Sequence, residues 1–148
     1  MARVLITGMS GAGKSTLLDE LARRGHRTID TDHDGWQPEH GRWDSTRMTA
    51  FLAGSADVVV SGTVENQGDF LDRFELVVLL SAPLEVLLER VARRSNNPYG
   101  HAPAERDDIR RYVVEVEPLL RRGADLELDG RLPVARLADL VERAIAAD

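Results

Sequence analysis

The stretch Gly8-Met9-Ser10-Gly11-Ala12-Gly13-Lys14-Ser15 decides the fold of this chain. It matches the phosphate-binding loop pattern G-x-x-x-x-G-K-[ST] at every specified position. Lys14 is the only lysine among the 19 lysine and arginine residues, so the compact ammonium group stands where a tight phosphate cradle suits it. The pattern predicts a loop that holds the polyphosphate of ATP or GTP.

The segments on either side of this loop support the match. Residues 3–7 form a short apolar run, which is typical of a buried strand. Residues 15–24 have helical spacing, with leucines on one side and charged residues on the other. A glycine-rich loop that leads into a helix brings backbone N–H groups and a partial positive charge to a phosphate. A glycine-rich turn before an ordinary helix is the alternative.

The residues expected to bind the nucleotide follow from this motif. Lys14 should reach the β- and γ-phosphates, and the hydroxyl group of Ser15 should hold Mg²⁺. We therefore expect ATP and Mg²⁺ as cofactors. The loop residues expected to contact them are Gly8, Gly11, Ala12, Gly13, Lys14, Ser15 and Thr16.

Composition and charge exclude several classes of function. The net charge of −6 argues against general binding of nucleic acid, and the absence of cysteine excludes disulfides and thiolate metal sites. No apolar run approaches the roughly 20 residues of a membrane helix, and the first predicted strand leaves no room for a signal peptide. We expect a cytoplasmic protein, a monomer or homodimer, that binds neither nucleic acid nor membranes and acts on a small-molecule acceptor substrate.

Strands alternate with helices along the rest of the sequence. Further strands are expected at residues 27–30, 58–61, 75–80 and 125–128. Further helices are expected at 45–52, with Ser45 as the candidate cap, from 83 to about 94, at 103–120 and from 133 onward. Five strands that alternate with helices predict an α/β fold, with a parallel sheet covered by helices on both faces. The length suits one domain, spanning residues 1–148.

Three absences narrow the class of nucleotide protein. The apolar strands at 58–60 and 77–80 end in Ser61 and Ser81, where a Walker B carboxylate would stand. There is no guanine-reading N-K-x-D motif, because the one lysine lies in the phosphate loop. The chain is also short for a motor or an AAA-type ATPase. The metal therefore needs a carboxylate from another part of the chain.

Asp30-Thr31-Asp32, at the end of the second predicted strand, is the best candidate for that carboxylate. Ligands of an open parallel sheet bind beyond the carboxyl ends of its strands, which places this pair near the phosphate loop. Two aspartates at i and i+2 on a strand point to the same side. One can hold Mg²⁺ while the other accepts the proton of an acceptor hydroxyl, which suits phosphoryl transfer to an alcohol. A turn-forming acidic cluster is the alternative.

The arginines form two groups, on either side of a polar turn at residues 95–100. Arg90, Arg93 and Arg94 precede the turn, and Arg106, Arg110 and Arg111 follow it. Guanidinium groups that arrive from both sides would neutralise the phosphoryl group in transfer. A solvated charged face is the alternative for any one of them.

The acceptor is expected beside the acidic pair. Arg47 is a candidate clamp for a substrate carboxylate or phosphate, and Trp36 and Trp43 for apolar walls of the pocket. Gly62 would let a substrate approach the backbone. A surface role for Arg47 and simple packing of the tryptophans are equally good alternatives. The four histidines lack metal-ligand spacing and are expected at the surface.

With these residues in place, the sequence resembles the small P-loop kinases that include shikimate kinase, gluconate kinase and adenylate kinase. The resemblance implies a three-layer fold with strand order 2-3-1-4-5 and a short lid at about residues 94–106. It implies that Asp30 works at the magnesium and that Asp32 binds the acceptor hydroxyl. It also implies that Arg90 stacks on adenine, that Arg94 contacts phosphate, and that the loop with Gly130 and Arg131 wraps the adenine.

The sequence departs from these kinases on the acceptor side. Shikimate kinase has a triple glycine where this chain has Ser61-Gly62-Thr63, and adenylate kinase has an arginine that is absent between Gly62 and Asp72. We therefore expect an ATP-dependent kinase that phosphorylates a hydroxyl of a small polar metabolite. Its predicted catalytic residues are Lys14, Asp32, Arg94 and Arg110. A nucleoside monophosphate kinase and a non-catalytic ATP-binding sensor are the alternatives.

Overall fold

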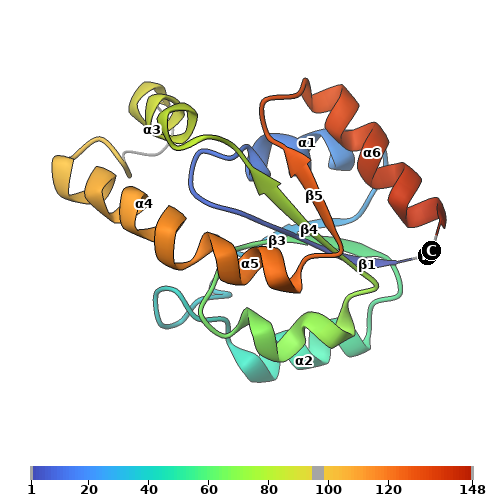
Figure 1. Ribbon diagram of the computed structural model, residues 1–148. Helices are drawn as coiled ribbons and strands as arrows, with labels where there is room; N and C mark the ends of the chain where they lie inside the picture. The colour runs from blue at the N-terminus through green and yellow to red at the C-terminus, as the bar shows by residue number, and fades with distance from the viewer. Residues whose placement is uncertain (1, 95–98, 148) are drawn as a thin grey trace.

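A five-stranded, all-parallel sheet forms the centre of the molecule, in the order β2-β3-β1-β4-β5 (Figure 1). The computed structural model describes residues 2–94 and 99–147. The fold class and the strand order expected from the sequence are confirmed. The strands are β1 (Arg3–Thr7), β2 (Thr28–Asp30), β3 (Val58–Ser61), β4 (Leu76–Ser81) and β5 (Leu126–Asp129).

Helices cover both faces of this sheet, as expected. Figure 1 places α1 and α6 together on one face and α2 on the other. The helices are α1 (Lys14–Arg23), α2 (Ser45–Ala53), the 3-10 helix η1 (Gln67–Arg73), α3 (Leu84–Arg93), α4 (Pro103–Glu115), α5 (Glu117–Gly123) and α6 (Val134–Ala147).

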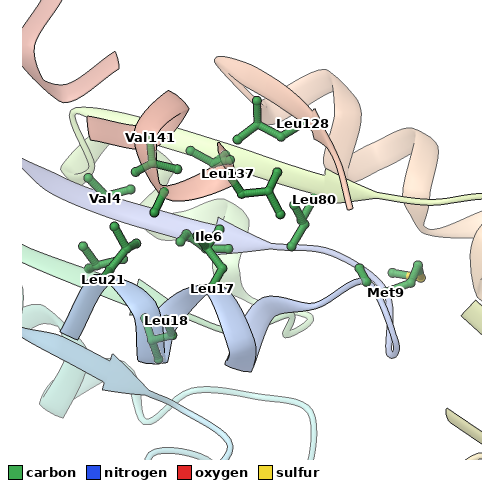
Figure 2. Close-up of a cluster of buried hydrophobic side chains, with 14 of the residues drawn as sticks. Val4, Ile6, Met9, Leu17, Leu18, Leu21, Leu80, Leu128, Leu137 and Val141 are labelled. Carbon is green, nitrogen blue, oxygen red and sulfur yellow. The ribbon is translucent and has the colours of Figure 1, made fainter. Parts of the chain in front are cut away.

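The alternation of side chains along β1 explains the three layers. Val4 and Ile6 point toward α1 and α6, where they pack in one core cluster with Leu17, Leu137 and others (Figure 2). Leu5, between them, points to the opposite face and packs in a second cluster with residues of α2. Because β1 is buried on both faces, its sequence is a continuous apolar run.

Two local expectations are wrong. The helix expected at residues 103–120 is two helices, since α4 ends at Glu115 and α5 begins at Glu117. Pro118 explains the break, because its ring has no N–H for a helix hydrogen bond and clashes with the preceding turn. Helix α2 is capped by Asp44 and not by Ser45: the Asp44 Oδ1 accepts a hydrogen bond from the Arg47 amide at 3.1 Å.

The predicted lid, residues 94–106, is only partly visible. Residues 95–98 lie outside the described residues, and α4 begins at Pro103. The lid and the extent of the domain therefore stay predictions. No helix within residues 2–94 and 99–147 combines the length and apolar character that crossing a bilayer requires.

Candidate functional site

The P-loop, residues 8–15, joins β1 to the start of α1 and encloses the ammonium group of Lys14. The Lys14 Nζ donates hydrogen bonds to the carbonyl oxygens of Gly8 and, at 3.3 Å, Met9. Burial lowers the pKa of Lys14 to about 8, and the charges of Asp32 and Asp30 oppose this shift. The expected lysine thus stands inside the loop, with both predicted carboxylates close enough to act on its charge.

The acidic pair lies at the carboxyl end of β2, as predicted. Asp30 ends the strand, and its Oδ1 accepts a hydrogen bond from the Asp32 amide at 3.0 Å. Asp32 is therefore in a turn, and strand alternation is not what aligns the pair. Thr31 between them is fully buried and donates to the Ser61 carbonyl at 2.8 Å. The acidic cluster does form a turn, as the alternative interpretation predicted. In this turn both carboxylates lie near Lys14.

Two arginines at the end of α3 reach the P-loop. The Arg90 guanidinium donates to the carbonyl oxygens of Gly11 and Ala12 at 3.3 Å each, and to that of Gly130 at 2.8 Å. Arg94 donates to the Ser10 hydroxyl at 3.0 Å. Burial lowers the pKa of Arg94. The structure thus brings both predicted arginines against the P-loop, while adenine stacking by Arg90 and phosphate contact by Arg94 stay predictions.

The arginines of α4 divide differently from the prediction. Arg110 is exposed and pairs with Asp107 at 2.6 Å, which fits the solvated-face alternative. Arg111 pairs with Asp108 in the same way. Arg106 is half-buried, and its Nε is buried with no hydrogen-bond partner among the described residues. A buried guanidinium nitrogen without a partner is costly, and among the described α4 arginines Arg106 is the one with such an unsatisfied donor.

The loop after β5 packs directly on the P-loop. A Cβ added at Gly130 would lie 2.4 Å from the Ala12 carbonyl oxygen, so only glycine fits there. The neighbouring Arg131 turns to the surface and pairs with Asp129 at 2.9 Å, which holds the pKa of Asp129 down at about 2. Gly130 therefore adjoins the P-loop, while Arg131 faces its own carboxylate partner, and the adenine contact that the resemblance implied for this loop stays a prediction.

Residues 31–44, here called the acceptor loop, use their aromatic side chains for packing. Trp36 and Trp43 are buried, and the Trp43 Nε1 donates to the Thr31 Oγ1 at 2.9 Å. The Arg47 guanidinium lies 3.8 Å from the centre of the Trp36 ring and donates to the Asp34 carbonyl at 2.7 Å. Both tryptophans therefore pack in the protein interior, as the alternative expected. Arg47, a candidate clamp for the substrate, contacts Trp36 and Asp34 of the acceptor loop in this structure.

The glycine after β3 also has a structural explanation. A Cβ at Gly62 would lie 2.2 Å from the Thr31 Oγ1 and 3.3 Å from the Trp43 ring. The space beside Gly62 is therefore filled by the protein's own side chains. Its role as a substrate contact, like those of Trp36 and Arg47, stays a prediction.

Thr63 is the site residue that sequence reasoning missed. Its hydroxyl donates to the Gly8 carbonyl at 2.7 Å and accepts from the Gly8 amide at 3.1 Å. The only signal in the sequence is its position after the third strand, at the edge where ligands of parallel sheets bind.

The histidines do not form a metal site. Three of them are exposed, and His26 is half-buried against Glu142 at 2.8 Å. Within the described residues, no group of three or more His, Cys, Asp or Glu side chains is arranged to hold an ion.

Comparison with known families and proteins agrees with this geometry. A family model described as an AAA domain matches residues 4–112. The short length of the chain was therefore not a valid reason to place it outside the AAA group. The chain is 32% identical to shikimate kinase of Nitrobacter winogradskyi over 146 residues, 85% of this chain and 68% of that protein. It is 29% identical to shikimate kinase of Bordetella pertussis over an alignment that covers 90% of this chain and 74% of that protein.

The same fold occurs in solved structures. Shikimate kinase from Acinetobacter baumannii in complex with shikimate superposes with a TM-score of 0.74 at 24% identity, covering 99% of this chain and 94% of that one.

Proposed function

The chain belongs to the AAA domain family and is a small P-loop kinase, and from this premise we propose that it transfers the γ-phosphoryl group of ATP to a hydroxyl of a small polar metabolite. One observation carries the proposal: the carboxylates of Asp30 and Asp32 both act on the buried ammonium of Lys14. A phosphate-gripping lysine and a proton-accepting carboxylate at one site are the parts that phosphoryl transfer to an alcohol requires.

The residues present fit a nucleotide-bound Mg²⁺. Ser15 is exposed in the first turn of α1, and among the described residues the Asp30 carboxylate contacts the Asp32 amide and, at 3.9 Å, His33. Magnesium ordinarily keeps several waters and takes its other ligands from phosphates and one or two protein oxygens. Ser15 and Asp30 would supply these protein oxygens, and the metal would neutralise charge on the phosphates.

Four further side chains complete the proposed mechanism. Lys14 and the P-loop amides hold the phosphates, and Asp32 orients the acceptor hydroxyl and accepts its proton. Arg94 stabilises the charge that develops on the phosphoryl group in transfer. We assign the second arginine of this role to Arg106 and not to Arg110, because Arg106 has the unpartnered buried nitrogen among the described residues.

The acceptor is proposed at the level of a chemical class. The curated relatives are named for shikimate, but this chain replaces the triple glycine of that family with Ser61-Gly62-Thr63. The acidic pair suits a hydroxylated acceptor such as a sugar, a polyol or a hydroxy acid.

A screen with radiolabelled ATP tests the proposal. The acceptors are shikimate, gluconate, neutral sugars, polyols and nucleoside monophosphates, each with the native chain and with Lys14→Ala as the blank. Transfer to a hydroxylated metabolite supports the proposal. Transfer to monophosphates alone would show a nucleoside monophosphate kinase instead, and ATP binding without transfer to any acceptor would favour a sensor.

A further inference from the structure

A chain of hydrogen bonds runs from η1 to the P-loop, and its direction is fixed. The Val64 amide donates to the Gln67 Oε1 at 2.8 Å, which turns the Gln67 Nε2 toward the Thr7 Oγ1 at 3.1 Å. Thr7 accepts there, and because Thr63 gives its one proton to the Gly8 carbonyl, Thr7 is the donor in the 3.0 Å contact with the Thr63 Oγ1. Thr63 in turn donates to the Gly8 carbonyl at 2.7 Å.

The Thr63 hydroxyl uses its whole hydrogen-bonding capacity in this network. It accepts from Thr7 and from the Gly8 amide, and it donates its one proton to the Gly8 carbonyl. Thr63 thus holds both polar groups of Gly8, the first residue of the P-loop. Since Gln67 and Thr7 are buried, water is poorly placed to replace a lost bond.

The position of Thr63 links the two halves of the site. Strands β2 and β3 pair with Asp30 opposite Ser61, and Thr63 follows Ser61 by two residues. The Gly8 carbonyl that receives the Thr63 proton also receives a hydrogen bond from the Lys14 Nζ. Thr63 therefore follows the strand that pairs with the strand of Asp30, and it bonds to the same carbonyl that the Lys14 ammonium contacts.

We propose that Thr63 is a positioning residue that sets the Gly8 peptide, and through it the Lys14 ammonium, in the geometry that receives a triphosphate. This inference rests on the proposed function, since it takes the P-loop as the nucleotide site. Two features of the side chain have different uses: the hydroxyl group makes all three bonds, whereas the methyl group makes none of them.

Thr63→Val and Thr63→Ser separate these features. Valine keeps the shape and removes the hydroxyl, while serine keeps the hydroxyl and removes the methyl. Calorimetry with Mg²⁺ and ATP, at a temperature where every variant is folded, should show affinity about tenfold weaker for Thr63→Val, the size of one lost buried hydrogen bond. Thr63→Ser should bind within about twofold of the native chain.

Ser55→Ala is the matched control. Ser55 is buried before the opposite end of β3, and its hydroxyl donates to the Phe51 carbonyl at 2.8 Å. The variant also loses a hydroxyl hydrogen bond, but away from the P-loop, so its melting temperature should fall while its ATP affinity stays unchanged.

Three outcomes decide the inference. If folded Thr63→Val binds ATP as tightly as the native chain and only its melting temperature falls, Thr63 is merely structural and the inference is overturned. If Thr63→Val does not fold, Thr63→Cys takes its place, because a thiol has nearly the size of the serine side chain but bonds weakly; affinity equal to that of Thr63→Ser would then overturn it. Failure of the native chain to bind any triphosphate would instead refute the proposed function.

Discussion

The P-loop and the acceptor loop meet at the same edge of the sheet but are built in different ways. The P-loop is held through backbone groups: Arg90 and Thr63 bond to its carbonyls and to one amide, and its own lysine bonds to the carbonyls of Gly8 and Met9. The acceptor loop is held by side chains, with Trp36 under Arg47 and Trp43 bonded to Thr31. Few sequences can adopt the backbone geometry of the P-loop, whereas many sets of side chains can pack in the acceptor loop. The half of the site with the P-loop (the nucleotide half) therefore follows a sequence motif, and the half with the acceptor loop (the acceptor half) does not.

Asp32→Asn should have the largest effect, and it should separate the acceptor half of the site from the nucleotide half. It should lower kcat by about 10²-fold or more, the scale of losing a general base, and leave the affinity for ATP nearly unchanged. Steady-state kinetics on the acceptor found by the screen, together with calorimetry, measure the two effects. An equal loss of ATP binding would assign Asp32 to the metal and make it part of the nucleotide half.

Lys14→Met tests whether the buried charge of Lys14 destabilises the folded chain. The unfolded chain keeps the lysine proton up to the ordinary pKa of 10.5, whereas the folded chain releases it above about 8. Unfolding therefore takes up a proton within this window, and the native chain gains stability as the pH rises through it. The difference in free energy of unfolding between Lys14→Met and the native chain should therefore be roughly 1–3 kcal/mol more favourable to the variant at pH 7 than at about pH 10.5.

Urea denaturation at the two pH values gives this difference. The hydrogen bonds of the Lys14 Nζ to Gly8 and Met9 are absent from the variant at every pH, so the pH-dependent part isolates the effect of burial. A stability difference that is constant with pH would contradict a buried, easily deprotonated lysine.

Arg106→Leu and Arg110→Leu form a matched pair on one helix. Arg106→Leu should lower kcat by about tenfold or more, because it removes a guanidinium poised for an anion. Arg110→Leu should change kcat by less than about twofold, since it breaks only an exposed ion pair. Kinetics on both variants would return Arg110 to the site if its loss were the larger.

Trp43→Phe should have the smallest effect, confined to the acceptor half. The phenyl ring keeps most of the packing but loses the hydrogen bond to the Thr31 Oγ1, which should cost about 1 kcal/mol of stability. ATP affinity should remain within about twofold of native. A marked loss of ATP binding would mean that packing in the acceptor loop also shapes the P-loop.

Particular residues show which parts of the fold could be predicted from the sequence. The spacing of Gly8, Gly13 and Lys14 predicts the loop, and apolar runs predict the strands, because both depend on local chemistry. The order of the strands came from the resemblance to known kinases, since composition does not say which strands pair. The break at Pro118 was predictable from its ring, although the apolar spacing on both sides hid it.

The site residues that the sequence leaves open have another cause. Arg106 and Arg110 stand four apart on one helix, and only tertiary packing decides which is buried. Thr63 became visible through its bonds to Gly8, which lies 55 residues away in the chain. Trp36 and Trp43 are equally good as pocket walls or core residues until their neighbours are known. These distinctions depend on long-range contacts that one sequence does not encode locally.

The seating of Gly130 on the Ala12 carbonyl has a practical consequence for anyone who trims this chain. The region matched by the family ends at residue 112, yet Arg90 donates one of its hydrogen bonds to the carbonyl oxygen of Gly130. A fragment cut at that boundary would leave β4 as a bare sheet edge, which invites aggregation, and would strip α1 of its cover from α6. We therefore expect that a fragment must include the closing helix α6 to keep the P-loop in place.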